Sequence, residues 1–170
     1  ETLRIANYLA PSSTFSWEVA SFDGSKVIAS NGMTATIKTA NENLRSAEFV
    51  FILGSWGTEH YQNHKLTAWL RKRARAGERI CGVELGSYIV ARAGLLDGKS
   101  ATIHWSWLNG FKENFDRVEV EESLFTLDSK VMTCSGGLAG VDLMLRLIEE
   151  INGSSFSGEI ADQMLHHPIR

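Results

Sequence analysis

The sequence predicts an α/β fold in which a mostly parallel sheet carries helices on both faces, a three-layer α/β/α arrangement with a small β-hairpin added near the N-terminus. Two observations lead to this prediction. Short apolar runs typical of buried strands alternate with longer stretches whose apolar residues recur at helical spacing. The connections are short, as in repeated βα units whose parallel strands bind ligands at their carboxyl ends. Because no repeat or second boundary interrupts this order, we expect one domain over residues 1–170.

The first elements are a helix and a pair of strands. Apolar residues on a single helical face predict a helix over residues 1–10. After a Pro-Ser-Ser-Thr loop, residues 17–22 alternate between apolar and polar, which predicts a strand. Asp23-Gly24 is a typical hairpin turn, so we expect the return strand over 26–30 and a further extended stretch over 33–38.

The middle of the chain contains the buried strands of the expected sheet. The uninterrupted apolar run at 48–53 predicts a fully buried strand of the parallel type. An amphipathic helix over 63–76 follows, and Gly77 ends it. A second apolar strand at 78–83 leads directly into a helix that starts at Ser87.

The same criteria assign the remaining elements. The run Gly94-Leu95-Leu96-Asp97-Gly98 ends the preceding helix. The elements that follow are a short strand over 100–104, a helix over 105–115, small strands at 118–120 and 124–127, a buried strand over 130–134, a strongly periodic helix over 138–151 and a final helix over 155–165.

The junction at residues 82–87, Gly-Val-Glu-Leu-Gly-Ser, is the most informative local feature. Gly82 and Gly86 flank it, and glycine allows the close backbone approach that an abrupt strand-to-helix turn requires. Such a turn, a nucleophile elbow, holds its central side chain out of the sheet. The central residue here is Glu84, and a carboxylate in place of a nucleophile favours a binding pocket. The alternative is an ordinary βα connection whose glutamate faces water or caps the helix.

Composition excludes several classes of protein. With 44% hydrophobic and 22% charged residues among 170, the chain is typical of a globular domain with a real core. A net charge of −3 and scattered basic residues provide no surface for nucleic acid. The apolar runs are too short for a bilayer and no signal segment opens the chain, so we expect a cytoplasmic protein with no membrane partner. Cys81 and Cys134 lie in apolar strand patterns and are expected to be reduced and buried.

Longer motifs carry a family resemblance. They are the segment 82–105, which includes Ala91-Arg92-Ala93-Gly94-Leu95-Leu96-Asp97-Gly98, the stretch 19–32, Leu53-Gly54-Ser55-Trp56-Gly57, and residues 134–143. In these motifs the chain resembles the amidotransferase-like sensor domain at the N-terminal end of AraC-type transcriptional regulators, within the class I glutamine amidotransferase-like (ThiJ/PfpI) superfamily. The resemblance implies a flavodoxin-like, mostly parallel sheet. It also implies a C-terminal helix-turn-helix domain outside this chain, DNA contact only through that domain, and a homodimer.

The ends of the chain depart from this pattern. Domains of this kind open with a buried strand before the first helix, whereas this sequence begins inside that helix. We therefore expect the first, central strand to be absent. The sequence stops at 166–170, about where a linker to a DNA-binding domain would start. These departures are the pattern expected of an excised or incompletely observed sensor domain.

The elbow also departs from the superfamily's enzymes, which carry cysteine there. Glu84 cannot perform thiolate chemistry, so we expect no catalytic residue and no enzyme activity. His104 follows twenty residues later and matches the histidine that partners the elbow cysteine in those enzymes. We expect it to pair with Glu84 or to contact a ligand; the alternative is a core or strand-end histidine bonded to backbone.

Other candidates lie at the expected carboxyl ends of the strands. Gly54 and Ser55 match the turn where superfamily enzymes place oxyanion-hole N–H groups, which could instead hold a ligand carboxylate. The helix start near Gly136 offers unsatisfied N–H groups of the same kind. Tryptophan faces beside a carboxylate suit a quaternary ammonium. The expected ligand-binding residues are Glu84, His104, Trp105, Gly54, Ser55, Trp56, Ser135 and Gly136.

Each candidate has a purely structural alternative. The glycines can be plain turn residues, and the tryptophans, Trp107 included, can be core residues. His60 and His64 have a spacing that suits a metal but lack a third ligand, so we expect a solvated face and neither metal nor cofactor.

Three functional hypotheses follow. The first is a non-catalytic domain that senses a small polar metabolite, a quaternary amine or an amino acid, and controls an attached DNA-binding region. The second is a cysteine-dependent amidase, deglycase or hydratase, for which Cys134 is the better nucleophile because it precedes a helix N-terminus. The third is a domain that serves only for dimerisation.

Overall fold

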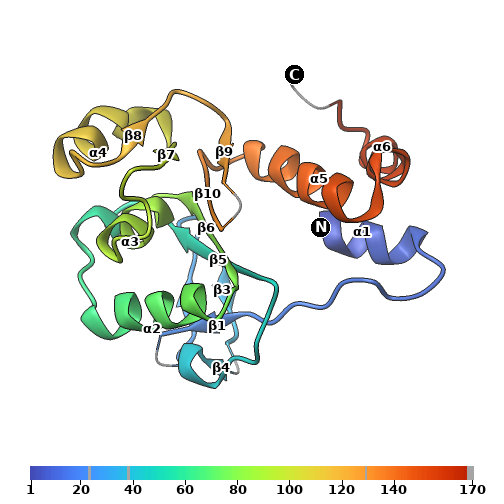
Figure 1. The fold of residues 1–170 in the computed structure, drawn as a ribbon. Helices are drawn as coiled ribbons and strands as arrows, with labels where there is room; N and C mark the ends of the chain where they lie inside the picture. Colours follow the sequence, from blue (N-terminus) through green and yellow to red (C-terminus); the bar gives the residue numbers. More distant parts are fainter. Residues whose placement is uncertain (23, 38, 129, 168–170) are drawn as a thin grey trace. The chain divides into compact units, whose positions relative to one another are not determined.

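The structure, a computed structural model, describes residues 1–22, 24–37, 39–128 and 130–167. A four-stranded sheet with the order β5-β6-β10-β9 is its central feature (Figure 1). The strands are β5 (Phe49–Gly54), β6 (Arg79–Glu84), β10 (Val131–Cys134) and β9 (Phe125–Leu127). The first three run parallel and β9 is antiparallel to β10, so the prediction of a mostly parallel sheet is confirmed.

Two helices follow these strands and pack against them, α2 (His64–Arg75) and α3 (Gly86–Arg92). The side-chain oxygen of Asn63 caps α2 by accepting the N–H of Leu66 at 3.0 Å. A φ of 95° at Gly77 ends this helix, as predicted. Helix α3 begins directly after β6 and contacts both β5 and β6, which fixes the elbow against the sheet.

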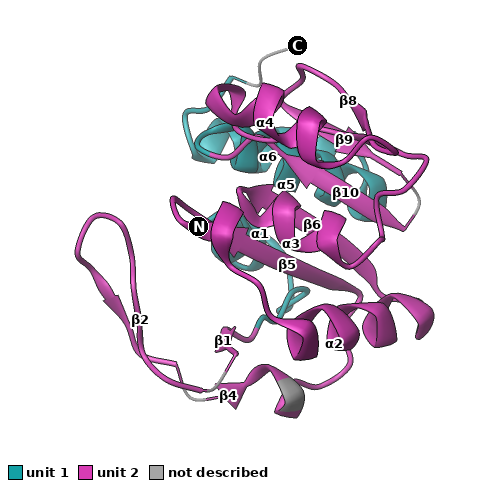
Figure 2. Cartoon of the chain, turned by 90° about the vertical axis from the view of Figure 1, so that its left-hand side faces the viewer, with its two compact units in different colours: residues 1–17, 137–170 teal, residues 18–136 magenta. Residues whose placement is uncertain are grey.

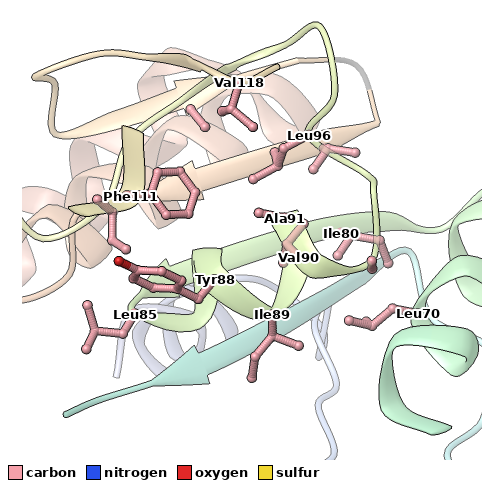
Figure 3. Packing of buried hydrophobic residues seen from close by; sticks show 14 of the residues in the cluster. Leu70, Ile80, Leu85, Tyr88, Ile89, Val90, Ala91, Leu96, Phe111 and Val118 are labelled. Carbon is pink, nitrogen blue, oxygen red and sulfur yellow. The ribbon is translucent and has the colours of Figure 1, made fainter. Parts of the chain in front are cut away.

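The main core lies between β6, α2, α3 and α4 (Leu108–Asn114) (Figure 3). Leu70, Ile80, Leu85 and Phe111 are fully buried in it. Tyr88 meets Phe111 edge-on with ring centroids 5.1 Å apart. Burial of large side chains such as these stabilises a fold by roughly 1.5–3 kcal/mol each.

Short elements complete this part of the chain. The helix expected over 105–115 starts as a 3-10 turn, η3 (Trp105–Trp107), and continues as α4. Strand β7 (Ser100–Ala101) pairs in parallel with β8 (Glu119–Val120), so the small strand predicted at 118–120 is confirmed.

The predicted pairing of the first strands is wrong. Strand β1 (Ala20–Ser21) pairs in parallel with β4 (Thr39–Ala40), and β2 (Val27–Ile28) pairs antiparallel with β3 (Thr34–Ala35). The hairpin reverses at Asn31–Gly32, where the N–H of Ala29 bonds to the carbonyl of Met33 at 2.8 Å. Asn-Gly supplies the positive φ that this turn needs, 83° at Gly32. Asp23, half of the predicted turn, lies outside the described residues.

Strand β5 is less buried than its apolar run predicts. Val50 is buried, but Leu53 is 74% exposed. Among the described strands β5 lies at the edge of the sheet, with β6 on one side only. The expectation of a fully buried strand at 48–53 is therefore wrong, because burial of both faces depends on neighbours that an apolar run does not reveal.

The chain divides into two compact units, residues 18–136 and residues 1–17 with 137–170 (Figure 2). The second unit contains α1 (Thr2–Leu9), α5 (Ala139–Asn152) and α6 (Ser154–Gln163), which confirms the three helices predicted there. Their shared core consists of Ile5, Ala6, Leu145, Ile148, Ile160 and Ala161. The described ranges include no helix with the length and apolar character that a membrane crossing requires.

Candidate functional site

The junction between β6 and α3 is a sharp elbow, as predicted. Strand β6 ends at Glu84 and α3 begins at Gly86. A Cβ atom added to Gly82 would lie 2.8 Å from the Cα of Ser87, and one added to Gly86 would collide with the carbonyl oxygen of Ile52. Any larger residue would force the backbone apart at both positions.

Glu84 has a strained backbone. Its φ of 54° lies in the left-handed region, which costs a residue other than glycine about 1–2 kcal/mol. Such strain persists only where surrounding structure imposes it, and it is concentrated at ligand and active sites. Glu84 makes no cap bond to α3, whose N-cap residue is Leu85. The helix-cap alternative therefore does not describe this glutamate.

Glycines from the two neighbouring strands line the elbow. Gly54, the last residue of β5, is the register partner of Glu84, and a Cβ there would collide with the backbone nitrogen of Gly86. Gly136 follows β10 with a φ of 91°, and its Cβ would lie 2.8 Å from the Cβ of Glu84. The structure thus brings together three of the expected site residues, Glu84, Gly54 and Gly136, at the carboxyl ends of three parallel strands.

The carboxylate of Glu84 is unpaired among the described residues. The residue is half-buried, and it forms no hydrogen bond or ion pair with any residue in the described part of the chain. A partly desolvated charge is costly when it is unpaired. A cation that reaches this carboxylate therefore gains an electrostatic contact without displacing a protein group.

His104 does not form the expected pair with Glu84. The N–H of Ser106 donates to His104 Nδ1 at 3.4 Å, and the Ser106 hydroxyl lies 2.8 Å from the same nitrogen. His104 thereby caps η3, and no ion pair or hydrogen bond to Glu84 occurs among the described residues. The alternative prediction, a histidine hydrogen-bonded to backbone, is therefore correct for the Nδ1 atom of His104. Contact of the ring with a ligand stays a prediction.

A buried hydroxyl network joins the elbow helix to the segment before η3, and sequence reasoning missed it. The hydroxyl of Ser87 donates to the carbonyl of Thr102 at 3.1 Å, and the N–H of Thr102 donates to Thr133 Oγ1 at 2.7 Å. Thr126 and Thr133 share a 2.6 Å bond between hydroxyls. The network thus connects α3, the residue after β7, and strands β9 and β10. Polar residues inside apolar strand patterns were the one available signal.

The loop after β5 is held by its own bonds. The N–H of Ser55 donates to Thr58 Oγ1 at 3.1 Å, and the carbonyl of Ser55 accepts the N–H of Thr58 at 3.0 Å. The Ser55 N–H is therefore already bonded, and a ligand carboxylate could take it only by displacing Thr58. Trp56, the next residue, is 78% exposed.

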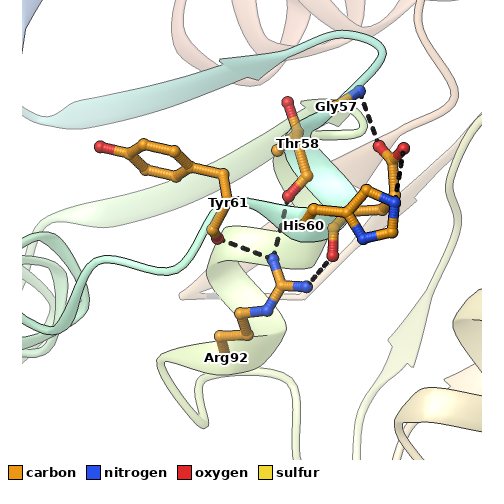
Figure 4. Close-up of polar contacts among 6 residues, drawn as sticks. Gly57, Thr58, His60, Tyr61 and Arg92 are labelled. Carbon is orange, nitrogen blue, oxygen red and sulfur yellow. Dashed lines mark hydrogen bonds and ion pairs between the residues drawn. The ribbon is translucent and has the colours of Figure 1, made fainter.

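Arg92, at the end of α3, clasps this loop (Figure 4). Its Nη1 donates to the carbonyls of Thr58 and Tyr61, both at 3.0 Å, and its Nη2 donates to the carbonyl of Glu59. The guanidinium also lies over the ring of Tyr88, 5.3 Å from its centroid. Burial lowers the pKa of Arg92. No sequence motif pointed to this contact, because it joins residues more than thirty positions apart.

Ser135 forms its hydrogen bonds with Leu124, the residue that precedes β9. Its N–H and its hydroxyl both donate to the carbonyl of Leu124, at 2.8 Å and 3.0 Å.

Both cysteines are fully buried, as expected. Burial raises the pKa of the Cys81 thiol, so its reactive thiolate form is disfavoured.

The remaining aromatic and histidine candidates separate into two groups. Trp105 is 73% exposed and its ring lies 5.6 Å from that of His104. Trp107 packs edge-on against Tyr88 and belongs to the core, as its structural alternative states. His60 is exposed and its Nε2 lies 3.7 Å from a carboxylate oxygen of Glu59, and the described residues contain no group of three side chains that could hold a metal ion.

Comparison with known proteins agrees with this architecture. A model of the DJ-1/PfpI family matches residues 1–150. The chain is 36% identical over 170 residues to the HTH-type transcriptional regulator CdhR of Pseudomonas aeruginosa, covering 100% of this chain and 50% of CdhR. It is 35% identical over 170 residues to the HTH-type transcriptional regulator GbdR of the same species, covering 100% of this chain and 46% of GbdR. The chain thus spans about half the length of the curated relatives it matches.

A solved structure shows the same fold. The AraC family transcriptional regulator from Pseudomonas putida superposes with a TM-score of 0.86, covering 96% of this chain and 88% of that chain at 22% sequence identity. At this sequence identity, the similarity shows a shared fold and does not extend to function. A mixed α/β fold with a mostly parallel sheet flanked by helices, similar to the N-terminal portion of HTH-type regulators, is therefore confirmed.

Proposed function

The chain belongs to the DJ-1/PfpI family, and from that premise we propose that it is a non-catalytic, ligand-sensing domain of an AraC-type transcriptional regulator. Its ligand is a small polar metabolite with a cationic group, a quaternary amine or an amino acid. Binding controls a helix-turn-helix region that contacts DNA, in a homodimer in the cytoplasm. The similarity to CdhR and GbdR, both named HTH-type transcriptional regulators, supports this context.

The observation that carries the proposal is the state of Glu84. Its backbone is strained at a φ of 54°, and its half-buried carboxylate has no partner among the described residues. Surrounding structure imposes this strained conformation, and strain of this kind is concentrated at ligand and active sites, so we assign the unpaired carboxylate to a ligand contact. Since the free group is an anion, the complementary ligand group is a cation.

Other expected site residues would suit a cationic ligand with a second polar group. Trp56 and Trp105 are exposed aromatic side chains on the segments that follow β5 and β7. Aromatic faces bind alkylated ammonium groups through cation–π attraction worth about 0.5–2 kcal/mol each. His104, beside Trp105, would offer a hydrogen-bonding group to the rest of the ligand.

The cysteine-dependent alternative is disfavoured by burial. Cys81 and Cys134 are fully buried, and a thiol without solvent contact cannot attack a substrate. The elbow, where a nucleophile would be exposed, carries Glu84.

The homodimer belongs to the same proposal. Ile28 and Met33 on the β2–β3 hairpin are exposed apolar side chains, and this hairpin projects from the rest of residues 18–136 (Figure 2). Exposed apolar clusters of this kind mark interaction surfaces. A domain that only dimerises would use the same surface, so ligand binding has to be tested separately.

A thermal-shift screen of the protein at its full natural length tests the proposal. The probes are choline, L-carnitine and L-arginine, each with an uncharged or acidic analogue. A ligand at a hundred times its Kd adds roughly 2.7 kcal/mol of stability. We expect a cationic probe to raise the Tm of the wild type and of the control Glu119→Gln, whose carboxylate is exposed, but not of Glu84→Gln.

Two results would contradict the proposal. If a cationic probe raised the Tm of Glu84→Gln as much as that of the wild type, the elbow carboxylate would not be part of the binding site. Silence with every probe, together with tight dimerisation, would favour the dimerisation role.

A further inference from the structure

Arg92 is a half-buried cation that no part of the proposed site uses. It forms no ion pair with a carboxylate in the described ranges, and its guanidinium instead contacts three backbone carbonyls and one aromatic ring. Partial burial of a guanidinium on neutral acceptors is costly, as its lowered pKa indicates. Because this contact is unfavourable for the guanidinium, we expect it to have a structural role, namely to hold the backbone that it binds.

The three carbonyls belong to η2 (Thr58–His60) and the residue after it. The carbonyl of Thr58 also accepts the N–H of Tyr61 at 3.0 Å. Carbonyls at the end of a helical turn carry partial negative charge, which a cation stabilises. A planar guanidinium with five N–H groups can reach several of them at once, whereas a lysine ammonium cannot hold the same fork. Within the loop, Glu59 adds a second brace by accepting the N–H of Gly57 at 2.8 Å.

The clasp closes a ring of structure around the elbow. Strand β5 ends at Gly54, and Ser55 and Trp56 continue from it into η2. Arg92 ties η2 to the end of α3, and α3 begins two residues after Glu84. Glu84 in turn pairs in register with Gly54. Each member of this ring is bonded to the next, so the clasp restrains movement of the loop away from the elbow.

We propose that Arg92 is a positioning residue of the ligand site: by clasping η2 it places the Ser55–Trp56 loop beside Glu84, without itself contacting the ligand. This inference rests on the proposed function. It also gives a role to the Ala-Arg-Ala-Gly-Leu-Leu-Asp-Gly motif, in which Arg92 is the second residue. Ligand affinity therefore depends on a side chain at the far end of α3.

The first test reads the position of Trp56 without any ligand. The full-length protein is labelled with 5-fluorotryptophan, and Trp56→Phe identifies the Trp56 signal among the five tryptophans of this chain. Arg92→Gln and the milder Arg92→Lys are expected to shift or broaden that signal. Those of the half-buried Trp69 and Trp107 stay unchanged. The control is Arg71→Gln, which removes a guanidinium with a single 3.5 Å contact to Ala93.

The second test measures affinity for choline, L-carnitine and L-arginine by calorimetry. With any probe that binds the wild type, Arg92→Gln is expected to raise the Kd at least tenfold, and Arg71→Gln to leave it unchanged. An unaltered Trp56 signal in both Arg92 variants overturns the inference. A mobile Trp56 with an unaltered Kd also overturns it and leaves the role of Glu84 intact. If no probe binds the wild type, the proposed function fails and the Trp56 signal alone decides whether Arg92 positions the loop.

Discussion

Replacing Glu84 by glycine is expected to make the protein more stable than replacing it by alanine. The order is normally the reverse, because glycine inside regular structure is less favourable than alanine by roughly 0.5–1 kcal/mol. At Glu84 the φ of 54° changes the sign. Alanine keeps the Cβ that makes the left-handed conformation unfavourable, and glycine does not.

The magnitude follows from two opposing terms. The left-handed conformation costs alanine about 1–2 kcal/mol that glycine avoids. Glycine loses about 0.5–1 kcal/mol more backbone entropy on folding. The central values differ by about 0.75 kcal/mol, so Glu84→Gly should be more stable than Glu84→Ala by about that amount, or about 1.5–3 °C in Tm for a chain of this size.

Urea denaturation of both variants measures this difference, and Gly158→Ala is the matched control. Gly158 lies inside α6 with an ordinary φ, and open space surrounds the position of its missing Cβ. Alanine is expected to stabilise that site by about 1 kcal/mol, the opposite sign from Glu84. If Glu84→Ala proved as stable as Glu84→Gly, the elbow would not be strained, and the reasoning from strain to ligand binding would fail.

Three further results are expected. Thr133→Val removes the acceptor of a buried N–H, so the free energy of unfolding should fall by about 1–3 kcal/mol in urea titrations, and an unchanged value would contradict the network. In the native protein Cys81 and Cys134 should react with a thiol reagent more than about 100-fold more slowly than in denaturant, because local opening must precede labelling; one fast, stoichiometric thiol would revive the enzyme hypothesis. The hydrogen bond from Lys99 lowers the pKa of Asp128, so its stabilising effect is present above the unfolded value of about 3.9 and is lost as the pH falls through the lowered native value. Asp128→Asn should therefore be less stable than the wild type at neutral pH, and an equally large gap in strong acid would refute the assignment.

Local chemistry made the elbow and the helices predictable. The backbone at Gly82 and Gly86 approaches its neighbours too closely for any larger residue, and the glycine spacing within six residues was enough to predict this. The end of α2 at Gly77 follows from the same kind of signal. The parallel sheet was equally accessible, because alternating βα units admit few other arrangements.

Long-range contacts were not predictable in this way. The pairings of β1 with β4 and β2 with β3 involve two residues per strand, too few to set a register from side-chain pattern. Arg92 reaches carbonyls more than thirty residues away, and backbone acceptors leave no trace in sequence. The bond between His104 and Ser106 is local, and a polar residue two positions after the histidine at a turn start was a signal that could have been used.

The most direct test of the central claim is the Kd of the strongest cationic ligand for the wild type and for Glu84→Gln, measured by calorimetry with Glu119→Gln as the control. For a ligand that donates an N–H to this carboxylate, a hydrogen bond to a charged group contributes about 1.5–3 kcal/mol, so the Kd of Glu84→Gln should rise by about 10- to 150-fold. A quaternary ammonium has no N–H, and its affinity should fall through the lost charge–charge contact alone. The Kd of the control should stay unchanged in both cases. Equal Kd values for the wild type and Glu84→Gln would show that the elbow carboxylate does not bind the ligand.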